Sequence, residues 1–333
     1  MRAAVLDRFG GPEVLQIRDL ADLTPGLAQV RVRVAATALN RADVLQREGR
    51  YPQPAPKPGD VLGLEFSGTV DLVGPGVTVW RPGDRVFGLV GEGGYAEQLI
   101  THERMLMRIP ERMSFDEAAA IPEVYFTAYD AVVDRAHVGL GDVVLIHAAG
   151  SGVGTAAIQL VKAMGAGVIA TTGTEEKARH AHDLGADRVV VYKKEAFEPI
   201  VMEETGGRGA DVILDFIGGP YLERNVSAAA LMGRIVLIGV LGAPRGEVDV
   251  TPFFSKRLTM IGTTLRARPL EQKIDLTQRF VKQLLPLFVA GRLKPIVDSV
   301  FSLDNIADAH RYMEENRNFG KIIVRTLEHH PRA

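Results

Sequence analysis

The stretch Val144–Gly173, VLIHAAGSGVGTAAIQLVKAMGAGVIATTG, has the residue types of a phosphate-binding turn. An apolar run, predicted to be a strand over Val143–His147, leads into a glycine-rich turn over Gly150–Gly154 and then an amphipathic helical pattern over Thr155–Met164. The free N–H groups and positive dipole end of such a helix suit the pyrophosphate of a dinucleotide. Because the turn lies between a strand and a helix, we expect dinucleotide binding. The turn residues expected to contact the cofactor are Gly150, Ser151, Gly152 and Val153.

The end of the next apolar run lacks an acidic residue. A site for NAD places Asp or Glu about 20 residues past the turn, on the ribose 2′-hydroxyl, but this chain reads Thr172, Gly173, Thr174. A carboxylate would repel a 2′-phosphate, whereas small and hydroxyl residues would not, so we expect NADPH. Lys177, or Tyr192 through its hydroxyl, could bind the phosphate. The alternative is that Lys177 is a solvated helix residue and that one of the two glutamates before it meets the ribose.

Other catalytic chemistries have little support in the sequence. The chain contains no cysteine, which excludes disulfides, thiolate nucleophiles and cysteine-bound zinc. The eight histidines are scattered, and His147, at the end of a predicted strand, is expected to be a satisfied core or turn residue rather than a base. Ser151 is not part of a G-x-S-x-G nucleophile elbow. Hydrolase chemistry is therefore not expected.

Composition limits the class of protein and its partners. The 333 residues are 46% apolar and 24% charged, as in ordinary globular proteins, and the net charge is −2, which does not favour nucleic acid or an anionic membrane as a partner. The N-terminus lacks the apolar stretch of a signal peptide, and no apolar run approaches the roughly 20 residues that span a bilayer. We expect a cytoplasmic protein.

Two patterns of predicted elements divide the chain. Residues 1 to about 120 read as short strands separated by glycine and proline, and four prolines in seven residues, Pro52–Pro58, predict an extended loop. From about residue 124, apolar strands alternate with helical segments, which is typical of a doubly wound parallel sheet. The predicted fold class is α/β, with a Rossmann domain over 124–265 and a β-rich domain formed by 1–123 and 266–333.

These motifs resemble the medium-chain dehydrogenase/reductase superfamily, and specifically its zinc-free quinone oxidoreductase branch. Where zinc alcohol dehydrogenases have a G-H-E metal motif, this chain has Gly63-Leu64-Glu65, and where they have a cysteine ligand followed by an acid it has Asn40–Asp43, NRAD. The family's A-x-x-G-x-x-G turn reads Ala148, Ser151, Gly154 here. That serine, together with stretches such as AAAIPEVYFTAYD and NRNFGKIIV, makes the chain resemble most the quinone oxidoreductases that are induced by a tumour suppressor in animals.

The resemblance implies a GroES-like catalytic domain beside the Rossmann domain, and it implies a set of site residues. Asn40, Tyr51 and Thr127 would lie around the nicotinamide, and Gly173, Lys177 and Tyr192 would hold the 2′-phosphate. Tyr51, Asn40 and Ser151 are the candidates for catalysis. The other residues expected to contact NADPH are Ile217, Ile238, Gly239, Leu265, Arg266 and Asn318.

The resemblance also implies an activity, namely NADPH-dependent reduction of quinones by direct hydride transfer without zinc, in a homodimer. Tyr51 is the candidate for a hydrogen bond or proton to the acceptor oxygen, and simple packing of its ring is the alternative. Two other functions stay open: an enoyl or alkenal reductase acting on α,β-unsaturated carbonyls, and an NADPH-sensing binding protein with incidental turnover.

Overall fold

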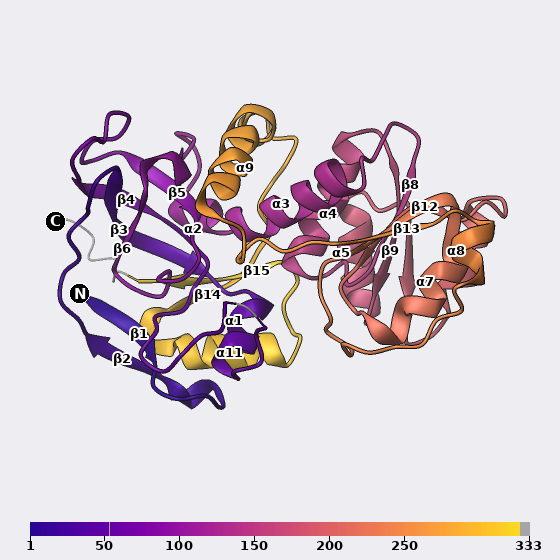
Figure 1. Ribbon diagram of the computed structural model, residues 1–333, viewed down its shortest axis with the longest axis horizontal. Helices are drawn as coiled ribbons and strands as arrows, with labels where there is room; N and C mark the ends of the chain where they lie inside the picture. The colour runs from indigo at the N-terminus through magenta and orange to yellow at the C-terminus, as the bar shows by residue number, and fades with distance from the viewer. Residues whose placement is uncertain (53, 327–333) are drawn as a thin grey trace. The chain divides into compact units, whose positions relative to one another are not determined.

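The computed structural model describes residues 1–52 and 54–326, which form two compact units. The first unit comprises Met1–Phe126, Arg266–Ala290 and the chain from Lys294, and the second comprises Thr127–Leu265 with Gly291–Leu293. The chain thus leaves the first unit at Thr127, returns to it at Arg266, and enters the second unit again briefly over Gly291–Leu293 (Figure 1). The boundary at which the chain passes from the first unit to the second lies inside helix α3 (Pro122–Tyr129), three residues beyond the boundary predicted at residue 123.

The first unit is built on a seven-stranded sheet in the order β14-β15-β3-β4-β5-β7, with β6 paired to β3. A separate antiparallel pair joins β1 (Arg2–Leu6) and β2 (Leu15–Asp19). The strands of the large sheet are β3 (Gln29–Ala38), β4 (Glu65–Val73), β5 (Arg85–Leu89), β6 (Gln98–His102), β7 (Leu106–Arg108), β14 (Val297–Ser302) and β15 (Lys321–Arg325). Its helices are α1 (Arg41–Arg47), α2 (Phe115–Ala119), α9 (Leu270–Gln283), α10 (Leu285–Val289) and α11 (Ile306–Glu314).

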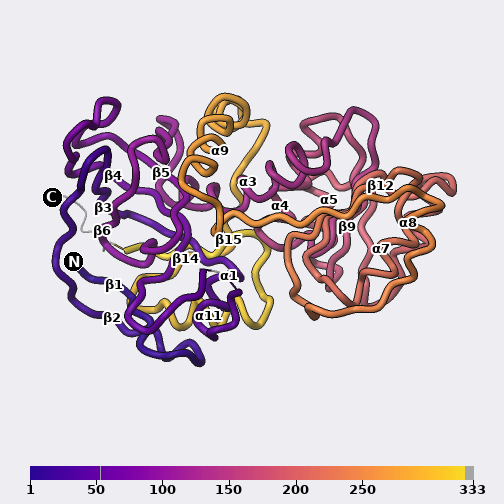
Figure 2. Tube along the Cα trace, in the orientation of Figure 1, coloured from indigo at the N-terminus to yellow at the C-terminus, as the bar shows by residue number. Residues whose placement is uncertain are grey.

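Strand β3 has alternating apolar and polar residues, and its apolar face is buried in the core. Val30, Val32 and Val34 are fully buried, and the arginines between them are more exposed, as the period-2 pattern predicts. Strand β15, from the far end of the chain, pairs antiparallel with β3, so Ile323 lies opposite Ala38. In Figure 2 the yellow C-terminal segment accordingly returns among the indigo N-terminal strands. This pairing brings two stretches that the site uses, residues 38–40 and 321, next to each other.

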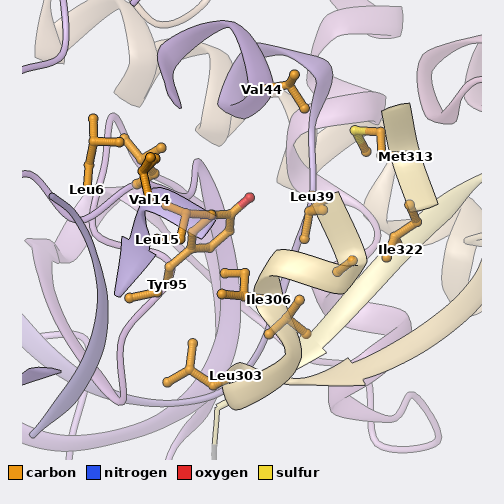
Figure 3. Packing of buried hydrophobic residues seen from close by; sticks show 14 residues of the cluster. Leu6, Val14, Leu15, Leu39, Val44, Tyr95, Leu303, Ile306, Met313 and Ile322 are labelled. Carbon is orange, nitrogen blue, oxygen red and sulfur yellow. The ribbon is translucent and has the colours of Figure 1, made fainter. Parts of the chain in front are cut away.

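One hydrophobic cluster of the first unit contains a polar residue that matters for the site. Leu6, Leu39 and Ile322 pack in it with residues of α1 and α11 (Figure 3). The ring of Tyr95 is fully buried in the same cluster, and its hydroxyl donates to Asp43 Oδ2 at 2.8 Å. A buried phenol usually needs such a partner. The hydrophobic packing therefore holds one end of a buried polar network.

The second unit is a six-stranded parallel sheet in the order β10-β9-β8-β11-β12-β13. In chain order this is 3-2-1-4-5-6, the arrangement of a Rossmann domain, and it confirms the predicted fold class. The strands are β8 (Val143–Ile146), β9 (Gly167–Thr172), β10 (Arg188–Val191), β11 (Ala210–Asp215), β12 (Ala229–Leu237) and β13 (Thr259–Gly262). The helices are α4 (Gly152–Ala163), α5 (Glu175–Asp183), α6 (Phe197–Glu204), α7 (Leu222–Ala228) and α8 (Thr251–Ser255), and a π-helix (Asp130–Arg135) continues α3.

Helix α4 begins earlier than the sequence predicts. The glycines Gly152 and Gly154 suggest a turn up to residue 154, but the helix starts at Gly152 because Ser151 caps it. The Ser151 Oγ accepts a hydrogen bond from the Gly154 N–H at 3.0 Å, which satisfies one of the N–H groups that a helix N-terminus leaves unpaired. The predicted turn therefore already contains the first helical turn. Among the described residues, no helix has the length and apolar character needed to cross a bilayer.

Candidate functional site

Most of the predicted cofactor residues lie at the carboxyl ends of the parallel strands in the second unit. The glycine-rich turn follows β8, Gly173 follows β9, Tyr192 follows β10, Ile217 lies two residues past β11, and Ile238 with Gly239 follows β12. The strand order reverses at β8, between β9 and β11. In open α/β sheets, ligands bind outside the carboxyl ends of the strands at this reversal.

The turn before α4 fits a bound pyrophosphate. A Cβ on Gly154 would lie 2.5 Å from Ala148 O and 2.7 Å from Ala149 Cα, so only glycine allows the helix to start this close to β8. With Gly154 N–H capped by Ser151, the N–H groups of Gly152 and Val153 belong to the first turn and have no acceptor within the helix. An anion is the natural partner for these groups and for the helix dipole.

The end of β9 is shaped by Gly173 and Tyr192. A Cβ on Gly173 would lie 2.9 Å from the Tyr192 hydroxyl, and Tyr192 is 44% exposed. Thr172 is buried, with its hydroxyl donating to Thr174 O at 3.3 Å. The Glu175 carboxylate pairs with Lys194 Nζ at 2.6 Å, and this partner lowers its pKa. Glu175, one of the two glutamates that could have met a ribose, is thus engaged with a lysine, which favours a 2′-phosphate at this strand end.

Lys177 lies in the first turn of α5, where its backbone N–H donates to the capping hydroxyl of Thr174 at 3.2 Å. Lys177 thus lies in the helix that follows Gly173. Its assignment to the 2′-phosphate stays a prediction, as does that of Leu265, which is buried three residues past β13.

A buried network that sequence reasoning missed fixes the turn after β11. The His147 Nε2 lies 2.7 Å from Asn225 Oδ1, and the Asn225 amide donates to Asp215 Oδ2 at 3.0 Å. The other Asp215 oxygen accepts from the N–H groups of Ile217 at 2.7 Å and Gly218 at 3.1 Å. Since Asn225 donates to Asp215 through its nitrogen, its oxygen must accept from His147, which is therefore the neutral Nε2–H tautomer.

Burial lowers the pKa of His147 to about 4, so the ring stays neutral at physiological pH. Its Nδ1 lies 3.1 Å from the Thr171 hydroxyl. The expectation that His147 is a satisfied core residue is confirmed. The sequence contains a signal for this network, since a histidine, an aspartate and an asparagine all occur at the ends of apolar strands or in the following helix.

A second buried network lies in the first unit, around Asn40. Asn40 precedes α1, and its Nδ2 donates to Glu65 Oε1 at 2.8 Å. Lys321 Nζ donates to Asn40 Oδ1 at 2.7 Å and lies 2.8 Å from the same Glu65 oxygen. The Glu65 Oε2 accepts from the Glu123 N–H at 2.8 Å. Asn40, Glu65 and Lys321 thus form one charge-balanced unit.

Two carboxyl groups beside this unit have raised pKa values. Burial raises the pKa of Asp43 to about 7, although hydrogen bonds from Tyr95 and from the Asn40 N–H act in the opposite direction. Burial also raises the pKa of Glu123 to about 8, and the negative charge of Glu65 adds to the effect. Such perturbed groups are typical of functional sites, although structural networks produce them as well.

Tyr51 and Arg266 lie together in the first unit. The Arg266 guanidinium lies over the Tyr51 ring, 5.3 Å from its centroid. The same guanidinium donates to Gly91 O at 2.9 Å and to Pro54 O. These contacts support the packing alternative for the Tyr51 ring and engage Arg266 within the first unit, so the predicted contact of Arg266 with NADPH finds no support in this geometry.

The remaining predicted residues are placed as follows. Asn318 donates to Gly320 O at 2.8 Å in the turn before β15, and Thr127 is buried on α3. The Ser151 hydroxyl is engaged in the helix cap, a structural role that does not support its predicted part in catalysis. Leu64, at the position of the histidine in G-H-E, is buried in the core. The described residues include no group of three or more His, Cys, Asp or Glu side chains placed to hold a metal ion.

Comparison with known families agrees with this architecture. The family model described as alcohol dehydrogenase GroES-like domain matches residues 26–111, and the one described as zinc-binding dehydrogenase matches residues 152–281. The quinone oxidoreductase of Homo sapiens is 32% identical over 314 residues, which cover 93% of each chain.

Solved structures are similar over nearly the whole chain. An NAD-dependent alcohol dehydrogenase is 39% identical, with a TM-score of 0.89 over 98% of this chain and 100% of the other. The quinone oxidoreductase of Escherichia coli, complexed with NADPH, is 28% identical, with a TM-score of 0.90 over 98% of this chain and 100% of the other. The dinucleotide turn, the two domain types and these relatives agree. The chain is an NAD(P)-dependent oxidoreductase that acts on a small molecule, and it belongs to the medium-chain dehydrogenase/reductase superfamily, among the relatives of the quinone oxidoreductases.

Proposed function

We propose that this protein reduces quinones with NADPH by direct hydride transfer and without zinc. The observation that carries the proposal is the use of Asn40 and Leu64 at positions where zinc members have a cysteine and a histidine. The Asn40 amide is held by Glu65 and Lys321, and Leu64 packs in the core. Neither side chain is a zinc ligand. A quinone is electrophilic enough to accept hydride without a Lewis acid, so it is the acceptor that suits such a site.

NADPH, when bound, supplies the hydride from C4 of its nicotinamide. The N-terminus of α4 would bind the pyrophosphate through the N–H groups of Gly152 and Val153. Gly173, the Tyr192 hydroxyl and Lys177 would take the 2′-phosphate. The related structures include one named as NAD-dependent and one complexed with NADPH, so the relatives do not decide between the two cofactors. The choice of NADPH is supported by the residues after β9.

Asn40 and Tyr51 are the residues that we assign to the acceptor side. Asn40 would orient the bound reactants through its amide, and Tyr51, whose ring packs against Arg266, would donate a hydrogen bond from its hydroxyl to the acceptor oxygen. Reduction of a quinone by hydride plus one proton gives the hydroquinone, so the chain has to supply or relay only that proton.

Oxidation of NADPH, followed at 340 nm with quinones, enones and aldehydes as acceptors, tests this proposal. We expect turnover with quinones that is unchanged by a chelator. Faster turnover of enones, with a larger loss for enones than for quinones in Tyr51→Phe, would support the alkenal reductase instead. Tight NADPH binding without turnover of any acceptor would support the NADPH-sensing binding protein.

A further inference from the structure

Lys321 places a buried positive charge next to Asn40. It lies at the start of β15, with a side chain only 3% exposed. Its Nζ donates to Leu39 O at 2.6 Å and Asn40 Oδ1 at 2.7 Å, and lies 2.8 Å from Glu65 Oε1. An ammonium group has three N–H donors, so each one has an oxygen acceptor. The charge is balanced by Glu65, which is fully buried.

This arrangement determines how the Asn40 amide is oriented. Lys321 can only donate and the Glu65 carboxylate can only accept, so the amide must turn its oxygen to the lysine and its nitrogen to the glutamate. The carboxylate is itself fixed by the Glu123 N–H at 2.8 Å. The remaining contact of Asn40 Nδ2, to Ala38 O, is long at 3.4 Å. One amide proton is thus available for a stronger acceptor.

We propose that Lys321 is a positioning residue, which together with Glu65 holds the Asn40 amide in the one orientation that presents its second N–H to the bound reactants. The inference rests on the proposed function of Asn40 in quinone reduction. Lys321 itself has all three protons engaged by the protein, so it would act through Asn40 and not by contact with the acceptor.

A double-mutant cycle tests this coupling. We expect Lys321→Met and Asn40→Ala each to lower kcat with a quinone by roughly 10- to 100-fold, the effect of losing one charge-assisted or positioned hydrogen bond. If Lys321 acts through Asn40, the double variant loses little more than the more damaged single variant. Losses that multiply would overturn the proposal, as would an unchanged kcat in Lys321→Met. KM for the quinone and the Kd for NADPH, measured by fluorescence, show which step changes.

Arg325→Met is the matched control. Arg325 is a basic residue on the same strand, and its half-exposed side chain pairs with Asp116 at 2.6 Å. Its removal also deletes an ion pair of β15 but leaves Asn40 untouched. We expect kcat to stay within about twofold of the wild-type value, since an exposed pair contributes little. A loss equal to that of Lys321→Met would mean that any damage to β15 lowers the rate, and would overturn the proposal.

A charge-neutral variant separates positioning from folding. Lys321→Met alone leaves Glu65 buried without a counter-ion, which destabilises a fold strongly, whereas Glu65→Gln with Lys321→Met removes both charges. In this pair of substitutions we expect Tm to recover and kcat to stay low, because a glutamine can both donate and accept and no longer fixes the amide. Recovery of kcat together with Tm would overturn the proposal.

The orientation of the amide can also be measured without turnover. In ¹⁵N NMR spectra, the side-chain NH₂ group of Asn40, assigned by its loss in Asn40→Ala, should give two well-separated, slowly exchanging proton signals. In the charge-neutral variant the two signals should move towards those of a solvated asparagine, and unchanged signals would overturn the proposal. If the wild-type enzyme reduces no quinone, the proposed function fails, and the NMR result still decides whether Lys321 and Glu65 hold the amide.

Discussion

Gly173→Asp should shift the cofactor preference towards NADH, because it places a carboxylate at a position where the chain now has no acidic residue. Gly173 does not have the left-handed backbone conformation that only glycine adopts easily, so an aspartate fits the backbone. Its Cβ would meet the Tyr192 hydroxyl at 2.9 Å. That hydroxyl is the far end of a side chain that is 44% exposed, and it can move aside. Thr172 is a poorer choice, since it is buried and an aspartate there would also disturb folding.

The size of the effect follows from simple electrostatics. A carboxylate about 4 Å from a phosphate charge costs about 1 kcal/mol in water and about 4 kcal/mol at a protein surface of lower dielectric. The exposure of Tyr192 favours the lower part of this range, about 1–2 kcal/mol, which is a loss of roughly 5- to 30-fold in kcat/KM for NADPH. A new hydrogen bond to the ribose should improve NADH by roughly 2- to 12-fold.

Steady-state kinetics with one quinone and both cofactors measures this change. Gly173→Asn is the matched control, since it has nearly the same shape without the charge and should lower kcat/KM for both cofactors by similar factors. The reasoning about the 2′-phosphate would be refuted if Gly173→Asp lost activity equally with NADPH and NADH, or if Gly173→Asn changed the preference as much as the aspartate.

The other predictions concern binding, stability and assembly. Lys177→Ala should lower kcat/KM for NADPH by roughly 10- to 150-fold and leave NADH nearly unchanged, whereas equal losses would mean that the lysine only stabilises the fold. Ser151→Ala removes the cap of α4 and should lower the free energy of unfolding in urea by about 0.5–2 kcal/mol, and no change would contradict the capping role. Asp43 has a pKa raised from 3.8 to about 7, so its stabilising effect is fully present below pH 3.8 and is lost as the pH rises through 7. The difference in unfolding free energy between the wild type and Asp43→Asn should therefore fall by on the order of 4 kcal/mol between pH 4 and pH 8, and a constant difference would contradict the raised pKa. We also predict a homodimer, since β13 (Thr259–Gly262) is an edge strand of the second unit and open strand edges tend to pair, and sedimentation as a monomer at micromolar concentration would contradict it.

The sequence predicts the order of elements well where periodicity is strong. The alternation in β3 and the strand-helix units of the Rossmann sheet are present as expected, because burial of one face or of both faces dictates the apolar pattern. The start of α4 was predicted three residues too late, since glycine propensity suggests a turn and the cap from Ser151 overrides it. Such local hydrogen bonds are hard to weigh from residue types alone.

The buried networks could not be predicted because they join residues far apart in the chain. Lys321 and Asn40 meet only through the pairing of β15 with β3, and Glu65 comes from β4. Nothing in the local sequence of NRNFGKIIV gives the partner of the lysine, although a charged residue at the start of an apolar strand is a signal that a partner exists. The same holds for Asp215 and Asn225: polar residues at a strand end and in the following helix signal that partners exist, but not which residues these are.

The most direct test of the proposed function is a comparison of kcat/KM for NADPH and NADH, with one quinone as acceptor and enzyme treated with a chelator. The absence of an acidic residue at positions 172–174 and the pairing of Glu175 with Lys194 predict a clear preference for NADPH, and the non-ligating residues Asn40 and Leu64 predict full activity after chelation. A preference for NADH, or loss of activity that returns when zinc is added, would contradict the account.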